Sequence, residues 1–204
     1  MTTMPTDRTR DTRQEIVRRF ADQLAAAGYL GASLDVVARD VGIKKASLYH
    51  HFPEGKESVY REAALQQIAG QVTRMRAVLE TGGALEDTLV GLASLHLDVE
   101  PGASALDQQI YDATRHVSDD VREEVSGAYV GGLIEPVVDL MRRAVTDGVL
   151  SGDPGFLAWS FLGLASSMAP IPDDVGMPPD RRGEQSARSV RAVVDLFLDG
   201  ARAH

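Results

Sequence analysis

Apolar residues recur every three or four positions along most of this chain, and no two alternating segments are joined by a hairpin turn. The first clear stripe contains Ile16, Phe20 and Leu24, which share one face of a helix because they are four residues apart. A Thr-x-x-Glu capping box at Thr12 predicts the start of this helix, and Gly28 predicts its end. The pattern therefore predicts an all-α fold.

Two short helices are predicted next, with a glycine turn between them. Ser33 is a favourable N-cap for the first helix, and Gly42 can adopt the backbone conformation that a tight turn requires. The second helix covers residues 44–51 and ends before Pro53. The residues predicted to hold it against the other helices are Ala46, Leu48 and Phe52.

Longer helical segments follow a break before residue 56. They are predicted at residues 56–79, 84–98, 104–116, 118–147, 154–168 and 185–202. Residues 169–184 contain four of the nine prolines and are predicted to form an exposed loop. Pro136 lies inside a predicted helix, where it removes the partner of the Gly132 carbonyl and predicts a kink. Two interpretations of this glycine-rich region remain open: a hinge that makes room for a ligand, or close packing of a neighbouring helix.

The charge distribution changes the picture of possible partners. The chain of 204 residues has 21 Lys and Arg against 30 Asp and Glu, a net charge of -9, which at first disfavours a nucleic-acid partner. The acidity is uneven, however, because residues 1–52 carry a net charge of +2 and residues 53–204 carry -11. No acidic residue occurs from Val41 to Pro53, as a helix that approaches phosphates requires.

The composition also restricts the chemistry and the location. The absence of cysteine excludes disulfides and metal sites that use thiolate ligands. The N-terminus is polar and lacks the apolar stretch of a secretory signal, and the apolar stretch at residues 156–169 is too short to cross a bilayer. We therefore expect a cytoplasmic protein with no membrane partner.

The two short helices, with paired lysines on the second, match the pattern of a helix-turn-helix. The decisive residues are Ser33, Val37 and Ala38, then VGIKKASLYHHF at residues 41–52, and Lys56. They resemble the DNA-binding domain of TetR-family (tetracycline-repressor-like) transcriptional regulators, and the resemblance covers residues 12–62. The loop between Phe52 and Lys56 resembles that of the LmrA/YxaF-like branch, with Glu54 in place of a glycine.

This resemblance implies an N-terminal three-helix DNA-binding domain over residues 12–55, preceded by a flexible arm over residues 1–11. Residues 56–204 would form a helical domain for effector binding and dimerisation. Ser33 and Lys56 would contact phosphates, the front of the second short helix would read base edges, and its later residues would contact the DNA backbone. The implied DNA-binding residues are Ser33, Lys44, Lys45, Ala46, Ser47, Tyr49, His50 and Lys56.

The C-terminal helices contain a candidate dimer interface. Residues 156–168 are apolar on most faces, which predicts a helix buried on all sides, and the last helix has one apolar face. Together they suggest a four-helix bundle between two copies, although they would also suit the core of a monomer. The predicted interface residues are Phe156, Trp159, Phe161, Leu164, Val190, Val194 and Phe197.

The remaining helices would enclose a pocket for a hydrophobic or amphipathic small molecule, and about half of the candidate residues are expected to be core. The candidates are Ile68, Val72, Met75, Leu92, His96, Ile110, Tyr111, Tyr129, Leu133 and Met141. Two pairs at helical spacing, His96 with Glu100 and Asp112 with His116, lack a third ligand, so we expect no metal site and no cofactor.

Three classes of function follow from these observations. The first is a homodimeric repressor that binds a pseudo-palindromic double-stranded operator and is released by a small-molecule effector. The second is a helical metal-dependent enzyme, which is disfavoured because the sequence lacks nucleotide-binding, hydrolase and metalloprotease motifs. The third is an adaptor that binds protein instead of DNA. We expect the first and expect no enzymatic activity.

Overall fold

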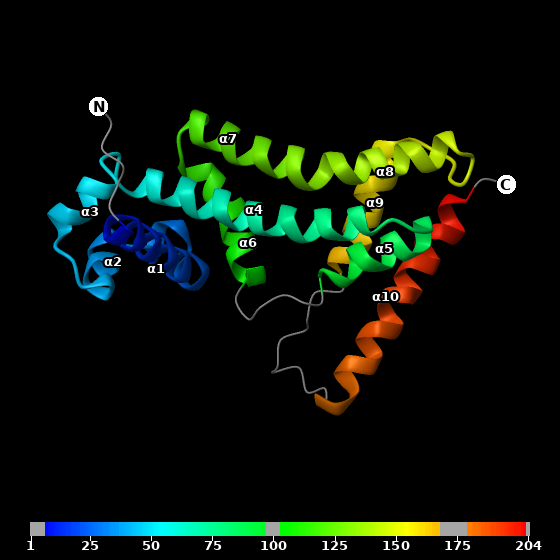
Figure 1. Cartoon of the computed structure of the whole chain (residues 1–204), viewed down its shortest axis with the longest axis horizontal. Helices are drawn as coiled ribbons and strands as arrows, with labels where there is room; N and C mark the ends of the chain where they lie inside the picture. The colour runs from blue at the N-terminus through cyan, green and yellow to red at the C-terminus, as the bar shows by residue number, and fades with distance from the viewer. Residues whose placement is uncertain (1–6, 97–102, 168–178, 203–204) are drawn as a thin grey trace. The chain divides into compact units, whose positions relative to one another are not determined.

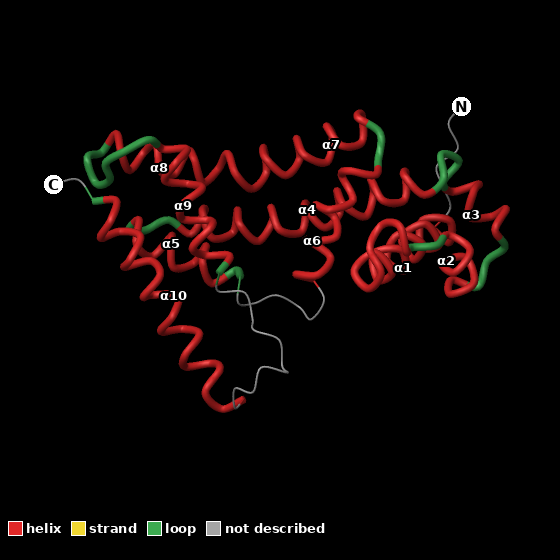
Figure 2. The backbone as a smooth tube through the Cα atoms, turned by 180° about the vertical axis from the view of Figure 1, so that it is seen from behind, coloured by secondary structure: helices red, strands yellow, loops and turns green. Residues whose placement is uncertain are grey.

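A computed structural model describes residues 7–96, 103–167 and 179–202, and these residues are almost entirely helical (Figures 1 and 2). The described ranges contain no strand, only an isolated antiparallel bridge between Leu150 and Arg202, so the all-α prediction is confirmed. The helices are α1 (Asp7–Gly31), α2 (Leu34–Val41), α3 (Lys45–His51), α4 (Lys56–Thr81), α5 (Leu85–Ser94), α6 (Ala103–Ala113), α7 (Asp119–Tyr129), α8 (Glu135–Thr146), α9 (Pro154–Ser166) and α10 (Pro179–Ala201). Two short segments, the 3-10 helix η1 (Thr114–His116) and the π-helix η2 (Val130–Ile134), complete the order.

The chain forms two compact units. Unit 1 contains Met1–Ala69 and Pro101–Ala128, and unit 2 contains Gly70–Glu100 and Tyr129–His204. The first half of α4, together with α6 and α7, therefore groups with α1, α2 and α3. This division differs from the boundary at residue 56 that the sequence suggested, because a long helix such as α4 can contribute to two cores.

The first helix begins earlier than its sequence pattern predicts. It starts at Asp7, so Thr12 and Glu15 lie inside the helix and the predicted capping box is wrong. Residues 7–11 of the predicted arm are helical, and residues 1–6 lie outside the described residues. Gly28 does interrupt the helical backbone, with φ of 69° and ψ of 174°, as its position predicted. The carbonyl of Gly28 accepts a hydrogen bond from the Ala32 N–H at 3.0 Å.

Unit 1 is built around one apolar core. The side chains of Phe20, Leu24, Leu48, Phe52 and Tyr60 are buried, and they come from α1, α3, the loop after α3, and α4. The Tyr60 hydroxyl donates a hydrogen bond of 2.8 Å to the backbone carbonyl of Ile110, which joins α4 to α6. Burial raises the pKa of Tyr60 to about 12. The hydroxyl therefore stays protonated and keeps this buried carbonyl satisfied at every physiological pH.

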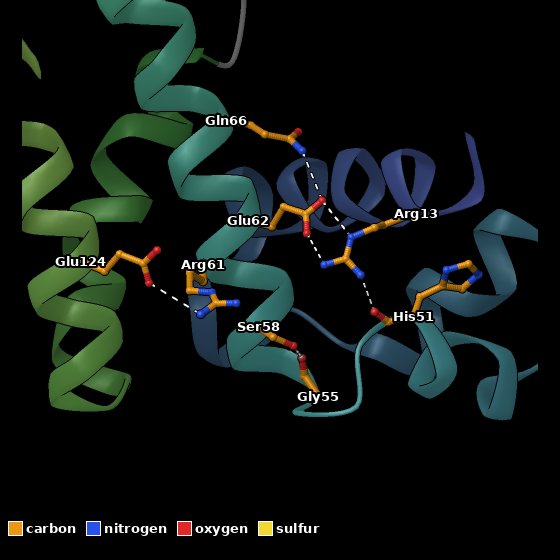
Figure 3. Close-up of polar contacts among 8 residues, drawn as sticks. All are labelled: Arg13, His51, Gly55, Ser58, Arg61, Glu62, Gln66 and Glu124. Carbon is orange, nitrogen blue, oxygen red and sulfur yellow. Dashed lines mark hydrogen bonds and ion pairs between the residues drawn. The ribbon is translucent and has the colours of Figure 1, made fainter. Parts of the chain in front are cut away.

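Arg13 connects three elements of unit 1 (Figure 3). Its guanidinium forms two hydrogen bonds with the Glu62 carboxylate on α4, one of them 3.2 Å between Nε and Oε1. It also donates to the backbone carbonyl of His51 at the end of α3, and it lies 4.0 Å from the centre of the Phe52 ring. A planar group with five donors can make all of these contacts at once. Arg13 thus fastens the end of α3 to α1 and α4.

Unit 2 packs α5 against α10 and α9 against α5, α8 and α10. Its centre includes Leu89, Met141, Phe161 and Val194, all fully buried. The Phe161 ring meets the Phe197 ring edge to face, with the ring centres 5.4 Å apart. The predicted start of α9 is confirmed, because the Asp153 carboxylate accepts a hydrogen bond of 2.8 Å from the Phe156 N–H.

The glycine-rich region before Pro136 takes a specific local form. The π-helical segment η2 separates α7 from α8, and the Glu135 N–H bonds to the carbonyl of Val130, five residues back. A Cβ atom on Gly132 would lie 2.5 Å from a methyl group of Val72, so the absence of a side chain lets α4 approach closely. This geometry favours the packing interpretation at Gly132.

One predicted loop is partly helical. Residues 179–184 belong to α10, whereas residues 168–178 lie outside the described residues. A proline at the first position of a helix does not break it, since the missing N–H would have no intrahelical partner there. The pattern of prolines therefore placed the end of the loop too late, because residues 179–184 are helical.

Substituting Arg13 tests its role in holding unit 1 together. We expect Arg13→Ala to lower the free energy of unfolding by about 1–2 kcal/mol, because it removes a two-pronged ion pair and a ring contact. The expected fall in Tm is about 2–8 °C for a chain of this size, measured by circular dichroism. The matched control is Arg18→Ala, since the ion pairs that Arg18 forms with other described residues are exposed and lie within α1. Equal Tm values for the two variants would contradict the assignment.

Candidate nucleic-acid interface

The helix-turn-helix geometry is present in unit 1. Gly42 ends α2 in the left-handed conformation, with φ of 75° and ψ of 28°. Its N–H donates to Arg39 O at 3.0 Å, and the N–H of Ile43 donates to Ala38 O at 2.9 Å. This hydrogen-bond pattern is a Schellman motif, which reverses the chain within two residues. The predicted role of Gly42 is confirmed.

The second helix of the motif, α3, is held by its C-terminal half. Leu48 and Phe52 are buried in the unit 1 core, as predicted, while Ala46 is exposed, so the prediction that it faces inward is wrong. Ala46 lies two residues from Leu48, about 200° around a helix, and so on the opposite side. Its methyl group thereby joins the outward face, where apolar contact with a thymine methyl is possible.

The outward face of α3 collects most of the predicted DNA-binding residues. Lys44, Lys45, Ala46, Tyr49 and His50 are exposed, and Ser47 is half-buried. Residues 45 and 49, like residues 46 and 50, are four apart and therefore neighbours on one side of the helix. No carboxylate lies on α3 itself. The face offers cations, a phenol, an imidazole and a hydroxyl.

Lys44 occupies the N-cap of α3 without capping it. Its backbone is extended, with φ of -74° and ψ of 148°, and its side chain makes no hydrogen bond to the helix. Lysine has no acceptor atom for the first N–H groups of a helix, so the start of α3 lacks the stabilisation that Ser or Thr would provide. The Lys44 side chain therefore does not cap α3.

Ser33 and Lys56 flank the motif, and both are half-buried. The Ser33 side chain does not cap α2, although its N–H donates to the Gln23 side chain at 2.9 Å. The Lys56 ammonium lies 4.6 Å from the centre of the Tyr29 ring, in a cation–π contact. Burial lowers the pKa of Lys56. The sequence pattern did not indicate Tyr29, which lies 27 residues earlier in the chain.

An ion pair links the two helices of the motif. The Nζ of Lys45 lies 2.7 Å from Oδ1 of Asp35, in the first turn of α2. The hydrogen bond to Asp35 and the charge of Asp35 raise the pKa of Lys45. Lys45 was predicted as a DNA-reading residue, but its carboxylate partner was not. The pairing depends on how the turn brings α2 and α3 together.

The candidate effector residues are dispersed. Met75, Leu92, Leu133 and Met141 are buried in unit 2 and His96 is half-buried there, while Ile110 is buried in unit 1. Two further candidates also divide between the units: Val72 is half-buried in unit 2 and Ile68 is buried in unit 1. Burial lowers the pKa of His96, which favours its neutral form. Tyr111 is 67% exposed and Tyr129 is 45% exposed, so neither belongs to the core, and their place in a ligand pocket stays a prediction. Both have a polar hydroxyl that water can solvate.

The predicted dimer residues divide into two groups. Phe161, Val190, Val194 and Phe197 are buried within their own chain and contribute to its core, and their part in an interface between copies stays a prediction. Leu164 is half-buried. By contrast, Phe156 is 70% exposed and Trp159 is 58% exposed, so α9 is not buried on all sides within one chain. Leu196 on α10 is also exposed, although the sequence pattern did not single it out.

The structure bears on two further sequence observations. Across the described residues, no cluster of three His, Asp or Glu side chains is placed to hold a metal ion. Glu100 lies outside those residues, Asp112 accepts a hydrogen bond from Gln108, and the His116 ring stacks on that of Tyr29. None of the helices described is both long enough and apolar enough to span a membrane.

Residues 16–63 match the family described as "Bacterial regulatory proteins, tetR family". This segment of the chain therefore resembles the TetR family of regulators. The matched segment includes α2, the Schellman turn and α3, and therefore the whole outward face described above. The curated relatives that match this segment are named as transcriptional regulators.

Curated relatives resemble only part of this chain. The chain is 38% identical over 53 residues to the HTH-type transcriptional regulator LmrA of Bacillus subtilis (strain 168), in agreement with the LmrA-like loop. It is 39% identical over 51 residues to IcaR, a negative regulator of the icaADBC biofilm operon in Staphylococcus aureus (strain Newman). These matches span 26% and 25% of this chain and only 28% and 27% of the relatives.

A solved structure extends the similarity of fold to nearly the whole chain. A transcriptional regulator from Saccharomonospora viridis, solved in complex with choline, superimposes with a TM-score of 0.73. The superposition covers 96% of this chain and 100% of that one, at 20% sequence identity. The similarity of fold therefore extends to the C-terminal helices.

Replacing Lys44 tests the uncapped start of α3. We expect Lys44→Ser to be about 1 kcal/mol more stable than Lys44→Ala, because serine can accept a hydrogen bond from the first turn. Both variants remove the same charge, so their difference isolates the cap. Urea unfolding monitored by circular dichroism provides the measurement. The hypothesis fails if the two variants unfold at the same urea concentration.

Proposed function

We propose that this chain is a homodimeric DNA-binding repressor of the cytoplasm. Each copy places the outward face of α3 in the major groove of double-stranded DNA. The observation that carries the proposal is this acid-free face, presented by a Schellman turn and held by Leu48 and Phe52. A seven-residue helix fits within the major groove, which is about 12 Å wide.

The proposed contacts divide by position along α3. Lys44, Lys45 and Ser47 lie at the front of the helix and read base edges, with Ala46 beside them. Tyr49 and His50 contact the DNA backbone, as do Ser33 before α2 and Lys56 at the start of α4. The cation–π contact holds the Lys56 ammonium beside the Tyr29 ring. Lys56 would therefore contact a phosphate that lies next to this ring.

The acidic remainder of the chain supports selectivity. Residues 53–204 carry a net charge of -11, and DNA phosphates are repelled from such a surface. Binding then depends on the small basic region of residues 1–52, which carries a net charge of +2. We expect modest binding to random DNA and a salt dependence set by a few phosphate contacts.

Electrophoretic mobility shifts test DNA binding. The full-length protein should shift the DNA upstream of its own gene, and the shift should weaken as salt rises. Lys45→Ala combined with Tyr49→Ala should weaken the affinity at least about tenfold, since both side chains lie on the proposed contact face. The matched control is Arg18→Ala with Tyr111→Ala, which removes one cation and one exposed tyrosine elsewhere in unit 1. A salt-independent shift, or equal loss in both double variants, would reject the proposal.

Two copies are needed because one helix-turn-helix contacts too few base pairs for useful specificity. A dimer places two α3 helices about one DNA turn apart, which explains why we propose a pseudo-palindromic operator. Phe156 and Trp159 supply the best-supported contact between copies. They are three residues apart on one face of α9, and exposed aromatic side chains are common at the centres of protein interfaces.

Removing these aromatic side chains tests the dimer. We expect Phe156→Ser with Trp159→Ser to convert the protein from dimer to monomer in analytical ultracentrifugation, because their apolar surface then no longer favours association. Leu30→Ser with Tyr111→Ser serves as the control, since these side chains are equally exposed but lie in unit 1. A double variant that still sediments as a dimer would exclude α9 as the main contact.

We further propose that a small hydrophobic or amphipathic molecule binds the helical body and releases the DNA. The buried apolar side chains of Met75, Leu92, Leu133 and Met141 support this class of ligand. The structurally similar regulator solved with choline is consistent with a small-molecule effector, and the name of IcaR as a negative regulator is consistent with repression. Such a ligand acts by binding more tightly to a dimer whose α3 spacing does not fit DNA.

A further inference from the structure

Lys45 on α3 differs from a cation that only contacts a phosphate, because its ammonium already has a carboxylate partner. Its ammonium is 2.7 Å from the Asp35 carboxylate, and both side chains are 59% exposed. An ion pair this exposed contributes little to folding, because water screens the charges and both side chains lose conformational freedom. Yet Asp35 places a negative charge beside the face that meets DNA. A contribution to folding stability therefore does not explain the position of the Asp35 carboxylate, whereas an effect on DNA recognition would explain it.

The geometry restricts what the Lys45 ammonium can bind. An ammonium has three N–H donors, and the contact with Asp35 occupies one of them. The hydrogen bond to Asp35 also raises the pKa of Lys45, so the group remains protonated. Two donors stay available, and guanine presents two acceptors, O6 and N7, at its major-groove edge. A cation already paired with a carboxylate attracts a phosphate less strongly than a free one does.

We propose that Asp35 is a specificity-determining residue, which orients Lys45 toward a guanine and makes its contact with a phosphate unfavourable. This inference rests on the proposed DNA-binding function. Base edges are neutral, whereas phosphates are anions, so the Asp35 carboxylate disfavours non-specific binding more than binding to the correct base. A remaining lone pair of the carboxylate can also accept a hydrogen bond from the amino group of cytosine. The pair therefore suits a G·C base pair.

Asp40 provides a matched control on the same helix. It is exposed in the last turn of α2, and the described residues include no ion pair between it and α3. Asp35→Asn and Asp40→Asn each remove one negative charge from α2 and preserve the size of the side chain. Any general effect of charge on DNA affinity is then the same for both variants.

The experiment begins by selecting preferred sequences from a library of random duplexes with the full-length protein. Affinities for the selected duplex and for a scrambled duplex of the same composition are then measured by fluorescence anisotropy at one salt concentration. We expect Asp35→Asn to tighten binding to the scrambled duplex and to lower the ratio of the two affinities about tenfold. Asp40→Asn should tighten both and change the ratio less than twofold.

Two further measurements connect the effect to Lys45. In a Lys45→Ala background, Asp35→Asn should leave the affinity ratio unchanged, because the residue that it orients is absent. Exchanging the G·C pair under Lys45 for A·T should cost the wild-type protein about tenfold in affinity and the Asp35→Asn variant much less. Equal ratios for Asp35→Asn and Asp40→Asn would overturn the inference, and so would an undiminished effect in the Lys45→Ala background.

The results also separate this inference from the proposed function. If the wild-type protein selects no sequence and binds DNA without dependence on salt, both are rejected. If it selects a sequence but the two asparagine variants behave alike, DNA binding stands and the role of Asp35 is rejected. Thermal unfolding of the wild-type protein and the two asparagine variants should give equal Tm values, which would show that the variants differ in recognition and not in folding. A lower Tm for Asp35→Asn that accompanies its change in affinity ratio would reject the role of Asp35.

Discussion

The burial of Leu48 and Phe52 is the constraint on which the recognition surface depends. Helix α3 has only seven residues, and a helix so short is unstable in water without tertiary contacts. Its cap residue, Lys44, adds no hydrogen bond, so its stability comes from the other end. There Arg13 bonds to the His51 carbonyl and covers the Phe52 ring, while Glu62 holds Arg13 in place. Packing beneath the helix thus leaves its outward face available for binding.

Electrostatics then determines what this outward face can bind. The proposed repressor has few cations to offer DNA, and one of them, Lys45, is paired with Asp35. An acidic body and a partly neutralised recognition helix both reduce attraction to phosphates that carry no sequence information. Selectivity in this chain would therefore come from limiting non-specific affinity as much as from adding specific contacts.

The regions that were predicted well have strong local signals. Gly42 and Ser33 marked the ends of α2, and Asp153 with Pro154 marked the start of α9, because turns and caps depend on a few neighbouring residues. The helix start predicted at Thr12 was wrong for the same reason, since a capping-box sequence also fits the interior of a helix that begins earlier. The bounds of the two units differ from those that the sequence suggested, because the hydrophobic pattern of a long helix does not reveal where its core partners change.

By itself, the sequence determined that this chain is helical, that it contains a helix-turn-helix, and that its basic residues gather there, because each follows from spacing within a short segment. Only the tertiary structure decided which apolar side chains remain exposed. Phe161 and Trp159 are two positions apart in a mostly apolar helix, yet Phe161 is buried and Trp159 is exposed. It also decided that Lys45 meets Asp35 and that Arg13 meets Glu62. Such pairings depend on how helices pack, which no local pattern encodes.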